Sequence, residues 1–307
     1  MNILLLGKTG QVGWELGRSL ALLGELIAPD RHAADLEHLS SLRELIRDAR
    51  PDIVVNAAAY TAVDKAETEA ARARRINFEA VEVMAEEARR SGAWLVHYST
   101  DYIFDGKQER PYLEDDSANP LSVYGKTKWE GEQAIRGQHD RHLILRTSWV
   151  YGAWGNNFPK TILRLAKERP ELRIVSDQHG APTSAELIAD VTAAALHRIF
   201  ITNGASTRQN GDLSLAGTYH LAAAGETTWY DYARYVVELA AKHGVALSTT
   251  VDRIQPIPTD AYPVAAARPK NSRLDTTRLS TVFQLRLPEW RYQVRRLVQK
   301  LTRSEAA

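Results

Sequence analysis

The chain has 307 residues, of which 44% are hydrophobic and 25% charged, a composition typical of a soluble globular protein. Its formal net charge of +1 gives no reason to expect a polyanionic partner, so we expect no binding to nucleic acid. Because the sequence contains no cysteine, disulfides and thiolate metal sites are excluded, which fits a reducing cytoplasm. No uncharged stretch reaches membrane-spanning length, so we expect a cytoplasmic protein without a membrane partner.

The first residues predict a strand, a glycine turn and a helix. The apolar run 3–6 reads as a buried strand, and Leu16, Leu20 and Leu23 recur with helical spacing. In such a unit glycines let the backbone approach a pyrophosphate, and the helix N-terminus offers free N–H groups to the anion. The spacing here is G-x-x-G-x-x-G, so the position after the first strand is the stronger evidence for a dinucleotide site at Gly7, Gly10 and Gly13.

A second strand, 26–28, leads to an acidic residue at the distance where a carboxylate meets the adenosine ribose of a dinucleotide. This residue, Asp30, favours NADH, and its alternative role is that of a solvated loop carboxylate after Pro29. Arg31 follows directly and could pair with the 2′-phosphate of NADPH, or point into solvent. We therefore expect both NADH and NADPH to serve as cofactor.

Two further strands bring small and polar side chains to the same edge of the predicted sheet. Strand 53–55 runs into Asn56 and three alanines, which either leave room for a flat ligand or pack a strand tightly against a helix. Strand 94–98 delivers Ser99, Thr100 and Asp101. Because strands alternate with helices, we predict an α/β fold with a Rossmann-type, doubly wound parallel sheet.

A tyrosine and a lysine one helical turn apart form a candidate acid–base pair. If the segment after Pro120 is helical, Tyr124 and Lys128 share one face. A nearby ammonium favours the phenolate, so we expect the pKa of Tyr124 to lie below its usual value near 10. Such pairs also occur by chance on solvated helix faces, and the pair gains meaning only from its context.

The rest of the chain is less regular. A strand at 143–145 ends in Arg146, after which helical periodicity recurs at 162–166, 185–196, 232–240 and 294–301. We predict a dinucleotide-binding domain at 1–150, joined by part of 184–201, and a smaller, mostly C-terminal α/β substrate domain at 151–307. The segment 202–214 is rich in Asn, Gly, Ser and Thr and reads as an excursion of unassigned function.

Taken together, these motifs resemble the extended short-chain dehydrogenase/reductases that act on nucleotide sugars. An ordered set of motifs resembles one family among them, the dTDP-4-dehydrorhamnose reductases. Any one motif is weak evidence, but together they cover nearly the whole chain: 7–16, 61–67, 97–102, 124–128, 146–152, 155–158, 177–178, 180–183 and 268–269.

The resemblance implies NAD(P)H-dependent reduction of the C4 ketone of dTDP-4-dehydro-β-L-rhamnose. It implies Tyr124 as proton donor, Lys128 as the residue that holds the ribose, and Thr100 as hydrogen-bond partner of the substrate oxygen. The implied cofactor-binding residues are Gly7, Gly10, Gln11, Val12, Gly13, Asp30, Arg31, Asp35, Leu36, Ala58, Ala59, Tyr60, Thr61, Tyr124 and Lys128, and the implied substrate-binding residues are Thr100, Asp101, Trp149, Asn157 and Arg268. Trp149 has the alternative role of a core aromatic residue.

Some relatives form homodimers bridged by Mg²⁺ that glutamates hold. Glu15 and Glu186 match two of those positions, but Arg291 stands where the third glutamate would be, which argues against a metal-bridged dimer. Two rival functions stay open, another nucleotide-sugar reductase or epimerase and a non-catalytic dinucleotide-binding subunit. Dehydratases of the superfamily carry a second acid after Asp101, where this chain has Tyr102.

Overall fold

A computed structural model describes residues 1–201 and 212–303, so most of the segment 202–214 singled out above lies outside the described residues. Its centre is a six-stranded sheet in which every paired neighbour is parallel. In spatial order its strands are β10 (Gly217–His220), β5 (His142–Thr147), β4 (Trp94–Thr100), β3 (Ile53–Asn56), β1 (Asn2–Leu6) and β2 (Glu25–Ile27). The predicted second strand is thus displaced by one residue, and Asp30 follows a short irregular link.

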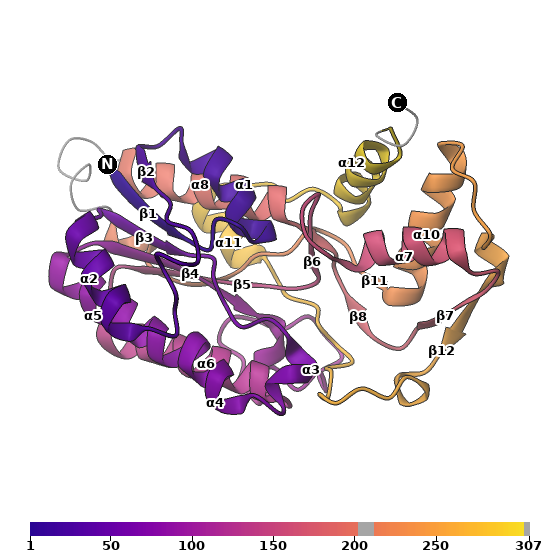
Figure 1. The fold of residues 1–307 in the computed structure, drawn as a ribbon, viewed down its shortest axis with the longest axis horizontal. Helices are drawn as coiled ribbons and strands as arrows, with labels where there is room; N and C mark the ends of the chain where they lie inside the picture. Colours follow the sequence, from indigo (N-terminus) through magenta and orange to yellow (C-terminus); the bar gives the residue numbers. More distant parts are fainter. Residues whose placement is uncertain (202–211, 304–307) are drawn as a thin grey trace.

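Helices cover both faces of this sheet (Figure 1), which confirms the doubly wound fold. Alternate residues of β1 point to opposite faces, so Ile3 and Leu5 join one hydrophobic cluster and Leu4 and Leu6 the other. The helices on one face are α2 (Leu39–Ala49), α5 (Ala80–Ser91) and α6 (Val123–Gln138), and those on the other are α1 (Gln11–Leu20), α8 (Ala185–Ile201) and α11 (Thr277–Phe283).

Short helical segments connect β3 to α5. They are α3 (Val63–Ala66), α4 (Ala70–Arg74) and a π-helical turn, Arg75–Glu79, that runs directly into α5. Single π turns inside helices often mark functional sites. Here the turn points the buried side chain of Asn77 at the loop after β3.

A smaller region lies beside the sheet, to its right in Figure 1. It pairs short strands in twos and packs them with three helices. Its elements are β6 (Val150–Tyr151), α7 (Phe158–Glu168), β7 (Leu172–Val175), β8 (His179–Gly180), β9 (Thr183–Ser184), β11 (Thr227–Thr228), α10 (Trp229–Lys242), β12 (Ile254–Ile257) and α12 (Trp290–Arg303). Strand β10 pairs in the large sheet and helix α8 packs on its face, although both follow residue 150. The chain therefore passes between the two regions more than once.

The order of the strands reverses between β1 and β3. From β1 the chain moves outward to β2, and it then returns to place β3 on the other side of β1. In open α/β sheets the crevice at such a switch point, outside the carboxyl ends of the strands, is the usual ligand site. The glycine turn and the three alanines both lie there.

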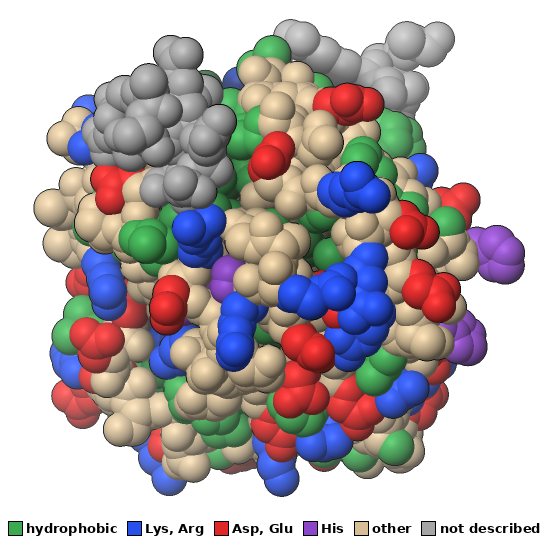
Figure 2. Space-filling view, turned by 90° about the vertical axis from the view of Figure 1, so that its left-hand side faces the viewer, with side chains coloured by type: hydrophobic (Ala, Val, Ile, Leu, Met, Phe, Trp, Pro, Cys, Tyr) green, Lys and Arg blue, Asp and Glu red, His purple; other side chains and the backbone are tan. Residues whose placement is uncertain are grey.

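Charged side chains of both signs are mixed over the end of the molecule that Figure 2 presents. This agrees with the small formal net charge of +1. Among residues 1–201 and 212–303, no helix combines the length and the apolar character needed to cross a membrane.

Two glycines of α1 provide a matched test of its packing. A Cβ on Gly13 would lie 2.0 Å from the carbonyl oxygen of Gly7, whereas a Cβ on Gly17 would meet nothing within 4 Å. We expect Gly13→Ala to lower the free energy of unfolding by about 1–3 kcal/mol, because the overlap forces a backbone shift. Gly17→Ala should raise it by about 0.5–1 kcal/mol through helix propensity. Urea unfolding measures both, and equal effects would contradict the packing of this turn.

Candidate active site

The glycine turn brings α1 close to the end of β3. Gly7 has φ +86°, and a Cβ there would lie 2.7 Å from the backbone nitrogen of Ala58. Gly10 precedes the first residue of α1 in an extended conformation. The N-terminal residues of the helix, Gln11 and Val12, therefore face the switch-point crevice, a suitable place for a diphosphate.

The loop after β3 is held from both sides by buried amides. The side-chain oxygen of Asn56 accepts a hydrogen bond from the Ala58 backbone N–H at 3.1 Å. Asn77 accepts from the backbone N–H of Tyr60 at 2.9 Å and donates to the Tyr60 carbonyl at 3.1 Å. The Tyr60 ring is buried and its hydroxyl donates to Glu69, so only the backbone of Tyr60 is left to face a cofactor, beside Ala59 and Thr61.

The predicted adenosine-binding residues lie in the turns after β2. The Asp30 carboxylate accepts from the backbone N–H of Ala33, which holds its pKa below the usual range and keeps it charged. The Arg31 side chain is 70% exposed and lies 3.9 Å from a carboxylate oxygen of Glu37, so its guanidinium is free to turn toward another anion. Asp35 accepts from the Glu37 backbone N–H. Leu36 is buried in the core, where its side chain serves packing.

Thr100, Tyr124 and Lys128 meet where the end of β4 faces the first turns of α6. Ser122 caps the helix, which places Tyr124 in its first turn as the sequence predicted. The Thr100 hydroxyl donates to the Asp101 carboxylate at 3.1 Å, and its effect on the pKa of Tyr124 places it near that phenol. Lys128 is buried, and its Nζ atom donates to the carbonyl of Tyr98 at 2.6 Å.

The expected lowering of the Tyr124 pKa is wrong for this structure. Burial raises the pKa of Tyr124 to about 12; the Thr100 hydroxyl offsets this only in part, and the charge of Asp101 adds to it. Burial also lowers the pKa of Lys128 to about 8, partly opposed by the charge of Glu132. Desolvation is thus the largest cause of both shifts. A tyrosine with a high pKa stays protonated at neutral pH, which suits a proton donor.

The aromatic residue after β5 has a strained backbone. Trp149 has φ +49°, a conformation rare for a bulky residue, and its ring stacks on Trp229 with a centroid distance of 3.7 Å. The Trp229 indole N–H in turn donates to Gln178. Such strain is retained where a side chain must point in one direction. The stack therefore places Trp149 beside α10 of the smaller region, where its ring is only partly buried.

Two predicted substrate contacts are engaged elsewhere. The Asn157 side chain caps α7 and donates to Gln11 and to the carbonyl of Gly152. Arg268 forms a two-point ion pair with Asp64, with distances of 2.6 and 3.0 Å. Both side chains thus join the two regions of the chain, and neither was expected to do so from sequence.

The two glutamates considered for magnesium each face an arginine. Glu15 pairs with Arg18 at 3.3 Å, whereas Glu186 lies 3.7 Å from Arg296. The Arg291 guanidinium lies over the ring of Trp290. Within the part of the chain that the structure describes, no group of three or more His, Cys, Asp or Glu side chains is placed to hold a metal.

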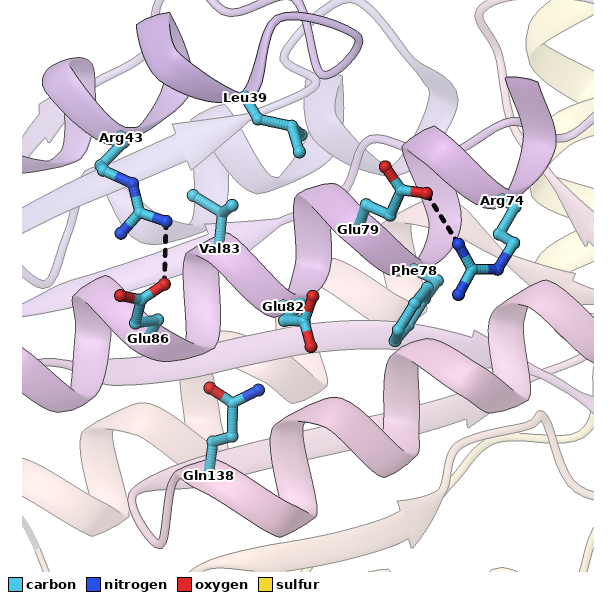
Figure 3. A pocket seen from close by; sticks show the side chains of 9 residues that line it. All are labelled: Leu39, Arg43, Arg74, Phe78, Glu79, Glu82, Val83, Glu86 and Gln138. Atoms are coloured by element: carbon cyan, nitrogen blue, oxygen red, sulfur yellow. Dashed lines mark hydrogen bonds and ion pairs between the residues drawn. The ribbon is translucent and has the colours of Figure 1, made fainter. Parts of the chain in front are cut away.

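A surface pocket between α2, α5 and α6 lies away from this site (Figure 3). Two ion pairs hold part of its charged lining, Arg43 with Glu86 and Arg74 with Glu79. None of the predicted site residues lines it.

Sequence reasoning missed three buried residues that support the site. Asn77 holds the loop after β3, while Asn56 and His97 form a hydrogen-bonded pair beside Lys128. The available signal was the position of Asn56 and His97 on strands that are otherwise apolar, where a buried polar side chain needs a partner. No such signal marks Asn77, because the π turn that orients it has no sequence signature.

A glycine turn at the switch point, with a Thr and a Tyr hydroxyl beside a buried Lys, defines an oxidoreductase of the short-chain dehydrogenase/reductase class. The family described as RmlD substrate binding domain matches residues 1–303. The dTDP-4-dehydrorhamnose reductase of Escherichia coli (strain K12) is 52% identical, and that of Salmonella typhimurium 50%, each over 98% of both chains. The chain therefore belongs to the dTDP-4-dehydrorhamnose reductase family.

Solved structures agree with this assignment. A dTDP-4-dehydrorhamnose reductase from Clostridium acetobutylicum matches with a TM-score of 0.86 and 33% identity, covering 98% of this chain and 99% of that one. The enzyme of the same name from Bacillus anthracis, in complex with NADP, also gives a TM-score of 0.86, with 31% identity and coverage of 97% and 99%.

The buried carboxyl of Asp101 makes stability depend on pH. Burial raises the pKa of this carboxyl to about 6. The Ser272 and Thr100 hydroxyls lower the pKa, but by less than burial raises it. The folded protein thus binds this proton more tightly than the unfolded chain. The free energy of unfolding therefore falls as the carboxyl loses its proton, progressively from about pH 4 to pH 6. We expect Asp101→Asn to be more stable than the parent at pH 7 by about 2–3 kcal/mol and nearly equal at pH 4.

Asp105 supplies the control for this measurement. Its hydrogen bonds from Lys107, Tyr112 and Asn119 hold its pKa below the usual value. Asp105→Asn should therefore be less stable than the parent at pH 7. Denaturant unfolding at both pH values measures the differences, and a loss of stability in Asp101→Asn at pH 7 would refute the buried charge.

Proposed function

We propose that this protein reduces the C4 ketone of dTDP-4-dehydro-β-L-rhamnose to dTDP-L-rhamnose with NADH or NADPH. The observation that carries the proposal is the grouping of the Thr100 hydroxyl, the Tyr124 phenol and buried Lys128 where the end of β4 faces the first turns of α6, at the carboxyl edge of the sheet. Its setting supports the substrate, since the chain is 52% identical to a dTDP-4-dehydrorhamnose reductase over 98% of its length. The absence of cysteine is consistent with a cytoplasmic location.

The glycine turn 7–13 and Lys128 would hold NADH or NADPH, which when bound would supply the hydride for C4 of the sugar. As the C4–O4 bond loses its double-bond character, negative charge grows on O4, and Tyr124 gives its phenolic proton to that oxygen. Thr100 donates a hydrogen bond to O4 and stabilises the charge as it develops. Lys128 binds the nicotinamide ribose, and in its charged form it stabilises the tyrosinate that remains.

The sugar and the diphosphate would enter from the smaller region. Trp149, held by Trp229, would face the sugar. Arg268 would bind the diphosphate by exchanging Asp64 for an oxygen of the ligand, and Asn157 would contact it beside the N-terminus of α1. Asp101, next to Thr100, would contact the substrate from the end of β4.

The rival function is a binding subunit that holds a dinucleotide without turnover. A pure binding role places no demand on the hydroxyls of Thr100 and Tyr124, yet both are present and lie near each other at the site. Oxidation of NADH or NADPH on addition of dTDP-4-dehydro-β-L-rhamnose, beside the same assay with other keto sugars, decides between the two. No oxidation with a correctly folded protein would favour the binding role.

Removal of the phenolic proton tests the mechanism. Tyr124→Phe keeps the bulk of the ring, so the cofactor should bind as in the parent while kcat falls about 100- to 10,000-fold. Tyr219→Phe is the control. Tyr219 lies on the edge strand β10, and its hydroxyl donates to the Leu215 carbonyl at 3.0 Å, so the change removes a phenol that is not part of the proposed site. A Tyr124→Phe protein with parental kcat would show that another group is the acid.

Cofactor choice tests the adenosine pocket. The Asp30 carboxylate repels a 2′-phosphate, whereas the exposed Arg31 guanidinium can pair with one. We expect both cofactors to be used, with Asp30→Ala moving the ratio of kcat/KM values toward NADPH and Arg31→Ala toward NADH. Steady-state rates with each cofactor give the ratios. Unchanged ratios in both variants would place the adenosine elsewhere.

A further inference from the structure

A continuous chain of buried hydrogen bonds connects Lys128 to the loop after β3. The Nζ atom of Lys128 lies 3.1 Å from Nε2 of His97, and Nδ1 of the same ring lies 3.1 Å from Nδ2 of Asn56. The Asn56 oxygen then accepts from the Ala58 backbone N–H at 3.1 Å. His97 and Asn56 are each 1% exposed, so water does not compete for these contacts.

The donors and acceptors in this chain can be assigned by elimination. The backbone N–H of Ala58 can only donate, so the Asn56 atom facing it must be the oxygen, and the amide nitrogen must face His97. That nitrogen also only donates, so Nδ1 of His97 must be the acceptor and carry no proton. A neutral imidazole then has its proton on Nε2, which points at the nitrogen of Lys128.

This assignment restricts the charge of Lys128. An ammonium group at Nζ would set two donors against each other, because it offers only N–H groups to an Nε2 that already has a proton. An uncharged amine has a lone pair to accept from Nε2–H and still donates to the Tyr98 carbonyl. The network is therefore complete only with an uncharged Lys128, a form that burial favours because it lowers the pKa of Lys128 to about 8.

The charged groups around Lys128 come from three elements. On α6 itself, Glu132 lies one turn further on and favours the ammonium, while Tyr124 lies one turn before. Arg146 on β5 pairs with Glu132 at 2.8 Å and weakens that influence. On β4 the facing titratable group is His97, whose pKa burial holds well below the usual value; a charge on Lys128 acts in the same direction.

We propose that His97, oriented by Asn56, is a positioning residue that ties the charge of Lys128 to the loop after β3. In the cofactor-free protein the ring presents Nε2–H to an uncharged amine, and the Asn56 amide holds the backbone of Ala58. Charging Lys128 requires the other ring tautomer, and that tautomer requires the Asn56 amide to turn and release Ala58. Lys128 thereby gains its charge together with a change in the loop that borders the cofactor site. Only the catalytic meaning of this coupling rests on the proposed function.

The tautomer of His97 is directly measurable by ¹⁵N NMR. In the full chain without cofactor at pH 7, we expect Nδ1 to show the shift of an unprotonated ring nitrogen and Nε2 that of a protonated one. Comparison with His97→Gln identifies the signals among the nine histidines. A proton on Nδ1 would overturn the proposal. This result does not depend on turnover, so it stands even if the protein reduces no sugar.

Asn56→Asp tests the coupling. The carboxylate still accepts from Ala58 but now also accepts from Nδ1–H, so Nε2 becomes an acceptor for the Lys128 ammonium. We expect the ring to change tautomer and the alkaline limb of the kcat/KM profile to move up by about one pH unit or more. In Asn56→Asp combined with His97→Gln, less than half of that shift should remain.

His139→Gln is the matched control, because His139 is also a buried histidine and contacts the Ala93 carbonyl at the other end of β4. It should change neither the tautomer of His97 nor the alkaline limb. An unmoved limb in folded Asn56→Asp, or a full shift in the double variant, would overturn the coupling. If Asn56→Asp does not fold, the spectrum of the parent protein still decides the assignment.

Discussion

Burial of the Lys128 side chain between α6 and β4 is the constraint on which the site depends. Its nitrogen reaches the Tyr98 carbonyl at 2.6 Å, which is possible only because the helix lies close to the end of the strand. A Cβ on Gly125 would lie 2.2 Å from the Tyr102 carbonyl oxygen, so the residue between Tyr124 and Lys128 must be small. The same close approach that buries the lysine also buries the tyrosine.

Burial changes what these two side chains can do. It favours the neutral form of each group, so the phenol keeps its proton and the ammonium loses its proton more easily. The acid in a ketone reduction must be protonated at neutral pH, and here desolvation maintains that state. Lys128 must then gain the positive charge that stabilises the tyrosinate when the site is occupied. In our proposal the buried hydrogen bonds of His97 and Asn56 couple that charge to the loop after β3.

The smaller region is attached to the sheet by polar contacts at the edge of the site. The Asp64–Arg268 ion pair and the hydrogen bond from Asn157 to Gln11 both join the two regions there. Substrate entering between them would meet groups that already hydrogen bond to each other. If the diphosphate binds there as proposed, it would have to replace these partners.

The sequence by itself determined the alternation of strands and helices, the glycine turn, and the placement of Tyr124 and Lys128 on one helix. These follow from local rules, namely apolar periodicity, a capping residue before α6 and the spacing of side chains on a helix. The residues that touch Thr100 and Lys128, however, come from strands and turns distant in the chain. Only the tertiary structure decided that β10 joins the large sheet, that Arg268 meets Asp64, and that the Tyr124 pKa rises. Desolvation and ion pairing depend on the distances between separate elements, and spacing along the chain does not encode those distances.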